Sequence, residues 1–335
     1  MALLPGSKAL VFAVGGGGDV ASAALLKHVL KSVYSDILVG SIPWERFKYD
    51  PIPGPIKYEE IRNYMEREKY VIVSGDSYAI RDGGEIVFQA AKVSRYLGED
   101  VVIVSPIYGF ESFVEGIKNV MRDYGLDTFI AVDVGGDIIC RGDEADLWSP
   151  MADAYGLAAA YRLYSEGFNS IVAIVSPASD GELPWEYIKD RLYSYYLEGA
   201  VLRVIGFGSE DLSFYKELLS YVDTEASSLA YEALTNGFGE RYIRGGSRRV
   251  TLDIHSTLTF FLHPEPLFRD SRPSQIISIS GSFEESNKLL LENGIPTEYE
   301  LEKIVFDLRR VYADEKELYI IARSKLMDFT KRRRP

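Results

Sequence analysis

The strongest constraint on the fold is an alternation of short apolar runs with longer segments that carry apolar residues at helical spacing. Two of the short runs, 101–104 and 171–175, are entirely apolar. Continuous apolar runs are typical of strands covered on both faces, as in a parallel sheet with helices on either side. We therefore predict an α/β fold, with a Rossmann-like, doubly wound and mostly parallel sheet and a C-terminal α+β extension.

The expected elements follow from these periodicities. Strands are predicted at 8–14, 36–41, 70–74, 100–105, 128–133, 170–176, 200–206, 250–254, 258–262, 275–280 and 318–322. Helices are predicted at 20–34, 57–68, 84–97, 110–125, 150–166, 184–197, 209–221, 224–236 and 283–293, and from Glu298 onward. We expect one α/β domain over 1–335, in which 1–222 form the parallel core and 223–335 pack on it. The proline-rich segment 42–56 is expected to be a rigid loop.

Composition narrows the function classes. Hydrophobic residues make up 47% and charged residues 26% of the chain, as in a folded globular protein. The net charge of −13 argues against nucleic acid or an anionic membrane as a partner. One cysteine, Cys140, argues against a disulfide or a cysteine-based metal cluster. No apolar run approaches a membrane span, and a cytoplasmic location is expected. Only two glutamines among many charged residues indicate a thermophilic source. The oligomeric state stays open.

A glycine-rich loop follows the first predicted strand. Gly16, Gly18 and Ala21 satisfy the pattern G-x-G-x-x-G/A in a strand–turn–helix context. Without Cβ atoms the backbone can approach a phosphate or ribose, and helix N–H groups point toward it. The residues predicted to bind ligand here are Gly15, Gly16, Gly17, Gly18 and Asp19. The alternative is a tight turn with Asp19 as the helix N-cap.

A second constellation, residues 133–153, is rich in carboxylates and follows another predicted strand. Crowded carboxylates repel one another unless a cation or hydrogen-bond donors offset their charge, and hard oxygen ligands suit Mg²⁺. We predict Asp133 and Asp137 as catalytic residues, Gly135 and Gly136 as ligand-binding residues, and Asp137 and Asp143 as metal ligands. The alternative is an acidic surface loop with Asp153 at a helix start.

Other predicted strands also end in small or polar residues. Since the carboxyl ends of parallel strands meet at one edge, Ser74, Asp76 and Ser176 are predicted to bind ligand there. Later in the chain, the glycine pair before Arg248 and Arg249 indicates either a phosphate clamp or a solvated hairpin turn.

These motifs carry a resemblance. The Gly15–Asp19 loop with Ala21, the 133–137 segment and the stretch 142–154 resemble a largely archaeal family known as domain of unknown function 1152. The segments 261–264 and 294–298 also resemble it, so the similarity spans most of the chain. The resemblance implies no particular reaction, substrate or catalytic residue.

The function predicted from the residues is binding of a nucleotide or another phosphorylated metabolite at the carboxyl edge of the sheet. If the protein is an enzyme, a divalent cation such as Mg²⁺ and the Asp133/Asp137 region are expected to carry phosphoryl transfer or hydrolysis. The absence of Walker, H-E-x-x-H and G-x-S-x-G motifs argues against a Walker-type ATPase, a common zinc protease and an α/β-hydrolase. One alternative is an NADP-dependent oxidoreductase with Ser41 and Arg46 on the 2′-phosphate. Another is a non-enzymatic ligand sensor or scaffold.

Overall fold

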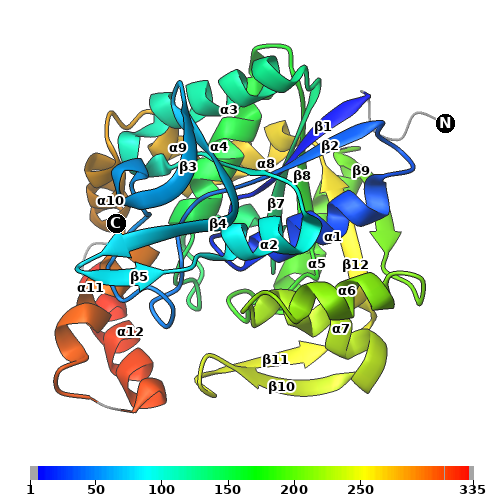
Figure 1. Ribbon diagram of the computed structural model, residues 1–335. Coiled ribbons are helices and arrows are strands. Elements are labelled where there is room, and N and C mark those ends of the chain that lie inside the picture. Colours follow the sequence, from blue (N-terminus) through cyan, green and yellow to red (C-terminus); the bar gives the residue numbers. More distant parts are fainter. Residues whose placement is uncertain (1–6, 313, 332–335) are drawn as a thin grey trace.

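The computed structural model describes residues 7–312 and 314–331, so the domain predicted over 1–335 can be followed over those ranges. A large mixed sheet runs through the molecule in the order β3-β4-β6-β2-β1-β7-β8-β12-β9, with β5 beside β4 (Figure 1). Its centre is parallel. The parallel strands are β6 (Val101–Ile103), β2 (Asp36–Ser41), β1 (Lys8–Ala13), β7 (Thr128–Val134) and β8 (Asn169–Val175).

The order of the parallel strands reverses at β1, which lies between β2 and β7. In an open α/β sheet such a reversal leaves a crevice at the carboxyl ends of the two central strands. Both margins of the sheet are antiparallel. On one side are β3 (Ile61–Arg67), β4 (Tyr70–Arg81) and β5 (Gly84–Ile86), and on the other are β12 (Leu258–Leu262) and β9 (Val201–Gly206).

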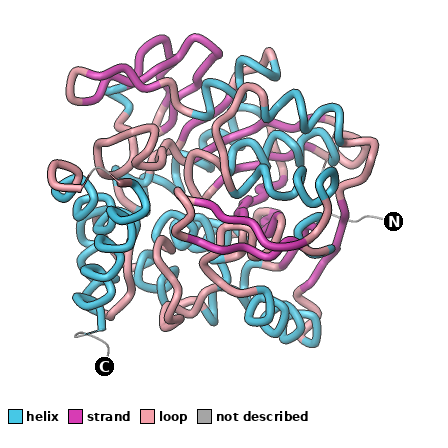
Figure 2. The backbone as a smooth tube through the Cα atoms, turned by 90° about the horizontal axis from the view of Figure 1, so that it is seen from below, coloured by secondary structure: helices cyan, strands magenta, loops and turns pink. Residues whose placement is uncertain are grey.

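Helices cover both faces of the sheet (Figures 1 and 2). Ala9, Val11 and Ala13 of β1 belong to one buried core, and Leu10 and Phe12 belong to the other. The first core is closed by α1 (Asp19–Leu30), α2 (Gln89–Leu97), α6 (Leu212–Leu219) and α7 (Ala226–Asn236). The second is closed by α3 (Phe110–Tyr124), α4 (Met151–Ser165), α5 (Trp185–Leu197), α8 (Pro264–Asp270), α9 (Arg272–Ser278) and α10 (Phe283–Glu292). Burial on both faces explains why these strands read as continuous apolar runs.

Two late segments extend beyond these layers at the same end of the molecule (Figure 1). The hairpin of β10 (Gly239–Ile243) and β11 (Arg248–Leu252) shares a small core with α7. The helices α11 (Glu298–Leu308) and α12 (Glu315–Lys331) share another with Trp148. No helix in the described ranges is long and apolar enough to cross a membrane.

Three predicted elements are wrong. The helix expected at 57–68 is a short 3₁₀ turn, η1 (Tyr58–Glu60), followed by β3, because pairing with β4 satisfies its backbone despite good helix formers. The strand expected at 275–280 lies mostly in α9, whose N-cap Ser271 accepts a hydrogen bond from the Ser274 amide. The strand expected at 318–322 is part of α12, where apolar residues at helical spacing pack around Trp148.

Candidate functional site

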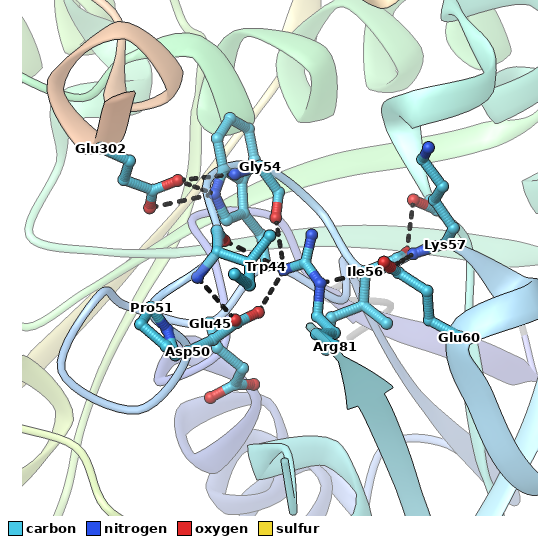
Figure 3. A network of polar contacts seen from close by, with 12 residues as sticks. Trp44, Glu45, Asp50, Pro51, Gly54, Ile56, Lys57, Glu60, Arg81 and Glu302 are labelled. Atoms are coloured by element: carbon cyan, nitrogen blue, oxygen red, sulfur yellow. Dashed lines mark hydrogen bonds and ion pairs between the residues drawn. The ribbon is translucent and has the colours of Figure 1, made fainter. Parts of the chain in front are cut away.

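The proline-rich loop 42–56 is held in place by buried polar contacts (Figure 3). Arg81 of β4 forms an ion pair with Asp50 and lies 3.3 Å from a Glu60 carboxylate oxygen. Its Nη1 donates to the carbonyls of Ile52 and Gly54 at 3.1 and 3.0 Å. Glu302 of α11 accepts hydrogen bonds from the Trp44 indole and the Gly54 amide, at 2.9 and 2.8 Å. The loop is therefore fixed from two sides.

This loop covers the glycine-rich turn between β1 and α1. The Gly17 amide donates to the Trp44 carbonyl at 2.7 Å. A Cβ on Gly17 would overlap the Glu45 carboxylate, and one on Gly15 would overlap Asp19 Oδ2. Gly16 has a φ of +112°, which side chains rarely allow. The space left by the missing side chains is used by groups of the protein itself.

Asp19 is not the N-cap of α1. The N-cap is Gly18, and the Asp19 carboxylate instead accepts a hydrogen bond from the Val134 amide at 3.2 Å. This contact reaches from the start of α1 across β1 to the end of β7. Asp19 therefore lies beside the acidic segment that follows β7. A ligand-binding role for Asp19 at the carboxyl edge, as predicted, needs this position.

Three aspartates from different parts of the chain meet at this point, and we call them the first carboxylate group: Asp19, Asp133 and Asp153. One carboxylate oxygen of each lies within 4.8 Å of the others. All three side chains are buried, at most 5% exposed. Within the described residues, Asp133 Oδ1 and Asp153 Oδ1 have no hydrogen-bond partner. Asp153 lies in the first turn of α4 (Met151–Ser165), as the alternative expected, and Asp143 and Asp146 are exposed, but Asp153 itself is buried beside Asp19 and Asp133.

A second carboxylate group consists of Asp137, Asp180 and Glu182, with one oxygen of each within the same 4.8 Å. Gly135 and Gly136, with φ of +117° and +108°, turn the chain from β7 into the 3₁₀ helix η3 (Asp137–Ile139). A Cβ on Gly135 would overlap Asp180, and the Ala178 amide donates to the Gly135 carbonyl at 2.6 Å. The glycine pair therefore allows the loop after β8 to approach the end of β7.

Burial dominates the electrostatics of both groups. It raises the pKa of Asp19 to about 7 and that of Asp180 to about 6. The pKa values of Asp133, Asp137 and Asp153 are also raised, by burial first and by neighbouring carboxylates second. Burial and mutual repulsion thus favour the protonated forms of these carboxyls, and a nearby cation would favour the ionised forms.

Glu182 differs because arginines face it. Burial favours a higher value, but Arg248 and Arg244 outweigh it and lower the pKa of Glu182 to about 2. Arg248 Nη1 donates to a Glu182 oxygen at 3.1 Å and to the Asp180 carbonyl at 2.9 Å. Arg244 Nη2 lies 3.8 Å from the same Glu182 oxygen. Both arginines come from the turn of the β10–β11 hairpin, so that turn is not simply solvated.

Part of this positive charge is unused. The Nε and Nη2 atoms of Arg248 are buried and have no hydrogen-bond partner among the described residues. Arg46, from the fixed loop, forms no ion pair within 4.0 Å in the described part of the chain, although Asp19, Glu182 and Asp137 all raise its pKa against the effect of burial. Burial, and then the positive charges of Arg248 and Arg46, lower the pKa of Arg244 to about 9.

The other predicted site residues are placed as follows. Ser176 ends β8 with a φ of +48° and a buried hydroxyl that lacks a partner in the described ranges. Asp143 is exposed and belongs to neither carboxylate group. The Ser41 hydroxyl donates to the Ile42 carbonyl at 2.9 Å. Ser74 and Asp76 lie elsewhere: β4 runs antiparallel to β6, so the chain passes the amino end of β6 after Val73. Their assignment to the carboxyl edge is therefore corrected.

Sequence reasoning did not assign four of the acids that the fold places here: Asp153, Asp180, Glu182 and Glu298. Asp180 and Glu182 follow β8 as Asp133 and Asp137 follow β7, and this parallel was a usable signal. Glu298 lies in the segment 294–298 that resembles the family, but the resemblance gave it no role. Its carboxylate accepts hydrogen bonds from the Met151 and Ala152 amides at 2.8 and 2.6 Å, which fills the N-terminus of α4.

Cavities adjoin the two groups. Two small ones, of about 20 and 30 Å³, lie beside Arg46 and are also lined by Asp19 and by Gly15, respectively. A larger cavity of about 520 Å³ is lined by Ala178 and Glu182 on one side and by β11 on the other. The site thus combines room for an ion or water beside the first group with a larger space beside the second.

Together these features define an α/β protein with a buried polar site of carboxylates and arginines at the carboxyl edge of a mixed sheet. The chain belongs to the family described as protein of unknown function DUF1152, whose model matches residues 10–306. The matched region contains both carboxylate groups and all three arginines, whereas α12 follows it. Comparison with curated proteins and with solved structures gave no match.

Proposed function

We propose that this protein binds a divalent cation, with Mg²⁺ as the first candidate, together with the phosphate of a nucleotide or another small metabolite, and that it catalyses phosphoryl transfer or hydrolysis. One observation carries the proposal: Asp133 Oδ1, Asp153 Oδ1 and Asp180 Oδ2 are buried without a hydrogen-bond partner among the described residues, and so are Nε and Nη2 of Arg248, whose Nη1 donates to the Asp180 carbonyl. Each set alone is costly, because unpaired buried polar groups lose their hydration. A cation and a bridging phosphate would satisfy both sets.

The first carboxylate group is the better cation site. Its three carboxylates face no arginine within ion-pair distance in the described part of the chain, and two of them offer an unpartnered oxygen. Hard carboxylate oxygens suit Mg²⁺, which commonly takes one or two of them and completes its shell with water and substrate phosphate. In the second group, Glu182 is already engaged by Arg248, Ser149 and two backbone amides. Asp137, the other acid predicted as a metal ligand, belongs to the second group and would be an additional ligand for the cation.

Arg248 and Arg46 would bind the phosphate that accompanies the cation. The side-on pair of Arg248, Nε and Nη2, matches the spacing of two phosphate oxygens, and Trp148 holds the guanidinium 3.7 Å above its ring. Arg46 approaches from the opposite loop. Asp137 lies with Asp180 and Glu182 in the second group, and a cation bound nearby would favour its ionised form, which would accept a proton from an attacking hydroxyl or water. Charge stabilisation and positioning would provide most of such catalysis, with the cation polarising the phosphoryl oxygens.

The strand order supports the same location. A parallel core whose order reverses beside β1 is what a Rossmann-like, doubly wound sheet requires, and ligands of such sheets bind at the reversal. Asp19 follows β1 and Asp133 ends β7, the two strands that flank this point.

The test is calorimetric titration of EDTA-treated protein with Mg²⁺ in the presence and absence of inorganic phosphate. We expect cooperative binding of the two, and loss of Mg²⁺ binding by at least about tenfold in Asp133→Asn, since a hard anionic ligand becomes neutral. Asp143→Asn is the matched control, because this exposed aspartate belongs to neither group. Full Mg²⁺ affinity in Asp133→Asn, or loss in Asp143→Asn alone, would contradict the proposed cation site.

Turnover separates an enzyme from a sensor. Nucleotides and sugar phosphates incubated with Mg²⁺-loaded protein should release or transfer phosphate, and Asp137→Asn should reduce that rate by about a hundredfold or more, as for loss of a general base. Binding of the same compounds without any turnover would instead favour the ligand sensor.

A further inference from the structure

The cavity of about 520 Å³ lies beyond the phosphate position and is not used by the chemistry proposed above. Its walls come from the loop after β8, the start of α5, β11 and the 3₁₀ helix η4 (Ile254–Thr257). It reaches the second carboxylate group through Ala178 and Glu182, which line it. Its volume lies in the range of small-molecule sites. Arg248 hydrogen-bonds to Glu182, which lines the cavity, so a ligand phosphate bound by Arg248 would lie next to this space.

One polar side chain on the wall is built for recognition. His255 is only 3% exposed, and its ring stacks on Trp185 with centroids 4.2 Å apart and an interplanar angle of 6°. The backbone of Thr251 hydrogen-bonds to the ring, whereas Nε2 has no partner among the described residues. Burial lowers the pKa of His255, so the ring is neutral at pH 7 and Nε2 offers a lone pair. A buried acceptor without a donor indicates a ligand group that donates.

The remaining polar wall also favours donors. Glu186 and Asp253 line the cavity; Glu186 forms an ion pair with Lys189, and the Asp253 carboxylate accepts the Ile254 amide at 2.7 Å. Arg249, a positive group on this wall, is paired with Glu240 at 3.0 Å. Trp185, Leu183 and Val250 supply apolar surface. Acceptors combined with an aromatic face suit a ring that carries hydroxyl groups, such as ribose or another sugar.

We infer that this cavity binds the hydroxyl-bearing part of the substrate, which is therefore a phosphate ester of a sugar or nucleoside, and that His255 Nε2 accepts a hydrogen bond from one of its hydroxyls. The inference rests on the proposed function, because the phosphate anchored at Arg248 directs the ester into the cavity.

The experiment compares three probes in saturating Mg²⁺ by calorimetry: inorganic phosphate, ribose 5-phosphate and AMP. Inorganic phosphate tests the anion site alone. We expect ribose 5-phosphate or AMP to bind at least about tenfold more tightly than inorganic phosphate, which corresponds to one or two added hydrogen bonds. A further gain for AMP over ribose 5-phosphate would identify a nucleotide, and equal affinity would identify the sugar phosphate.

His255→Phe removes the acceptor but keeps a ring that stacks on Trp185. It should abolish most of the advantage of the esters, about tenfold, and leave inorganic phosphate binding unchanged. The matched control is His263→Phe, since His263 is half-buried and packs edge-on against Tyr164 at 4.3 Å, outside this cavity. If His255→Phe does not fold, Trp185→Leu tests the same wall by removing the aromatic face.

The outcomes separate the two proposals. No binding of inorganic phosphate with Mg²⁺ would overturn the proposed function. Binding of inorganic phosphate with no gain for either ester, or equal losses for phosphate and esters in His255→Phe, would overturn the cavity assignment and leave the anion site intact.

Discussion

Two regions of this protein bury charged side chains, and they differ in whether those charges meet an opposite charge. Around the loop 42–56, Arg81 forms an ion pair with Asp50 and donates from Nη1 to two carbonyl oxygens, and its Nε, which has no hydrogen-bond partner among the described residues, lies 3.3 Å from a Glu60 carboxylate oxygen (Figure 3). At the carboxyl edge, by contrast, Asp133, Asp153 and Arg248 retain polar atoms without partners in the described residues. The buried cation of the first region is thus paired with carboxylates of the protein, whereas Asp133 and Asp153 form no ion pair in the described part of the chain, and the proposed cation would supply the missing charge.

The difference separates structural charges from functional ones. A buried charge that is fully paired contributes to one defined conformation, and removing its partner is costly. Buried charges without partners destabilise the folded state, and they persist where a ligand uses them. The two regions also touch: the fixed loop carries Arg46 to the carboxyl edge, so the satisfied network positions a member of the unsatisfied one.

The largest expected effect is the loss of stability when Arg81, which holds the loop 42–56, is replaced. Arg81→Met keeps the aliphatic stem but leaves Asp50 buried without its cation, and we expect the free energy of unfolding to fall by about 3–5 kcal/mol. Urea denaturation measures it, and Mg²⁺ should not restore it. Arg269→Ala, which breaks an exposed ion pair with Glu198, is the control and should cost less than about 1 kcal/mol. Similar losses in both variants would remove the distinction between the two kinds of charge.

At the carboxyl edge, neutralising a buried charge should not lower the free energy of unfolding of the metal-free protein, in contrast to Arg81→Met. Asp153→Asn relieves repulsion among buried carboxylates, so stability without cation should stay equal or rise slightly. Stabilisation by Mg²⁺, about 2.7 kcal/mol at a hundredfold excess over Kd for the wild type, should disappear. Urea curves with and without Mg²⁺ give both quantities. A large loss of stability in the metal-free variant would show that Asp153 is structural.

Glu302 sharpens the comparison, because it is hydrogen-bonded and yet burial raises its pKa to about 7 from an ordinary value near 4.5. Between these values the unfolded chain has released the proton and the folded chain has kept it. Stability therefore falls as pH rises from about 4.5 to 7, by up to about 1.4 kcal/mol per pH unit for this group.

The check is urea denaturation of metal-free protein at several pH values between 4.5 and 8. Glu302→Gln, which keeps one acceptor for the Trp44 indole, should show a shallower decline than the wild type. Identical slopes for the two proteins would mean that Glu302 does not ionise in this range.

The smallest expected effects come from single methyl groups in the glycine-rich turn. Gly15→Ala and Gly17→Ala each force a side chain to move, at about 1 kcal/mol of stability. The Gly15 methyl group pushes against Asp19 and Asp153, so we expect weaker Mg²⁺ binding. The Gly17 methyl group pushes against Glu45, and Mg²⁺ affinity should be nearly unchanged. Calorimetry that gives the reverse order would place the cation nearer Glu45.

Much of the fold was predictable from the sequence, because the central strands are buried on both faces and their apolar runs are unambiguous. The parallel core and most helices follow from this pattern. The antiparallel margins did not, since β3 is exposed and rich in helix formers and becomes a strand only through pairing with β4. The family resemblance was likewise visible in the motifs and is confirmed over residues 10–306.

For the candidate site, the sequence by itself determined that small residues and carboxylates follow β1, β7 and β8, because these strands can be recognised locally and their carboxyl ends share one edge. Only the tertiary structure decided which of those residues meet. It placed Ser74 and Asp76 at the other edge and left Asp143 exposed. It also brought Glu182, Arg244 and Arg248 together from distant segments. The physical reason is that ion pairing and burial depend on long-range approach, which no local periodicity encodes.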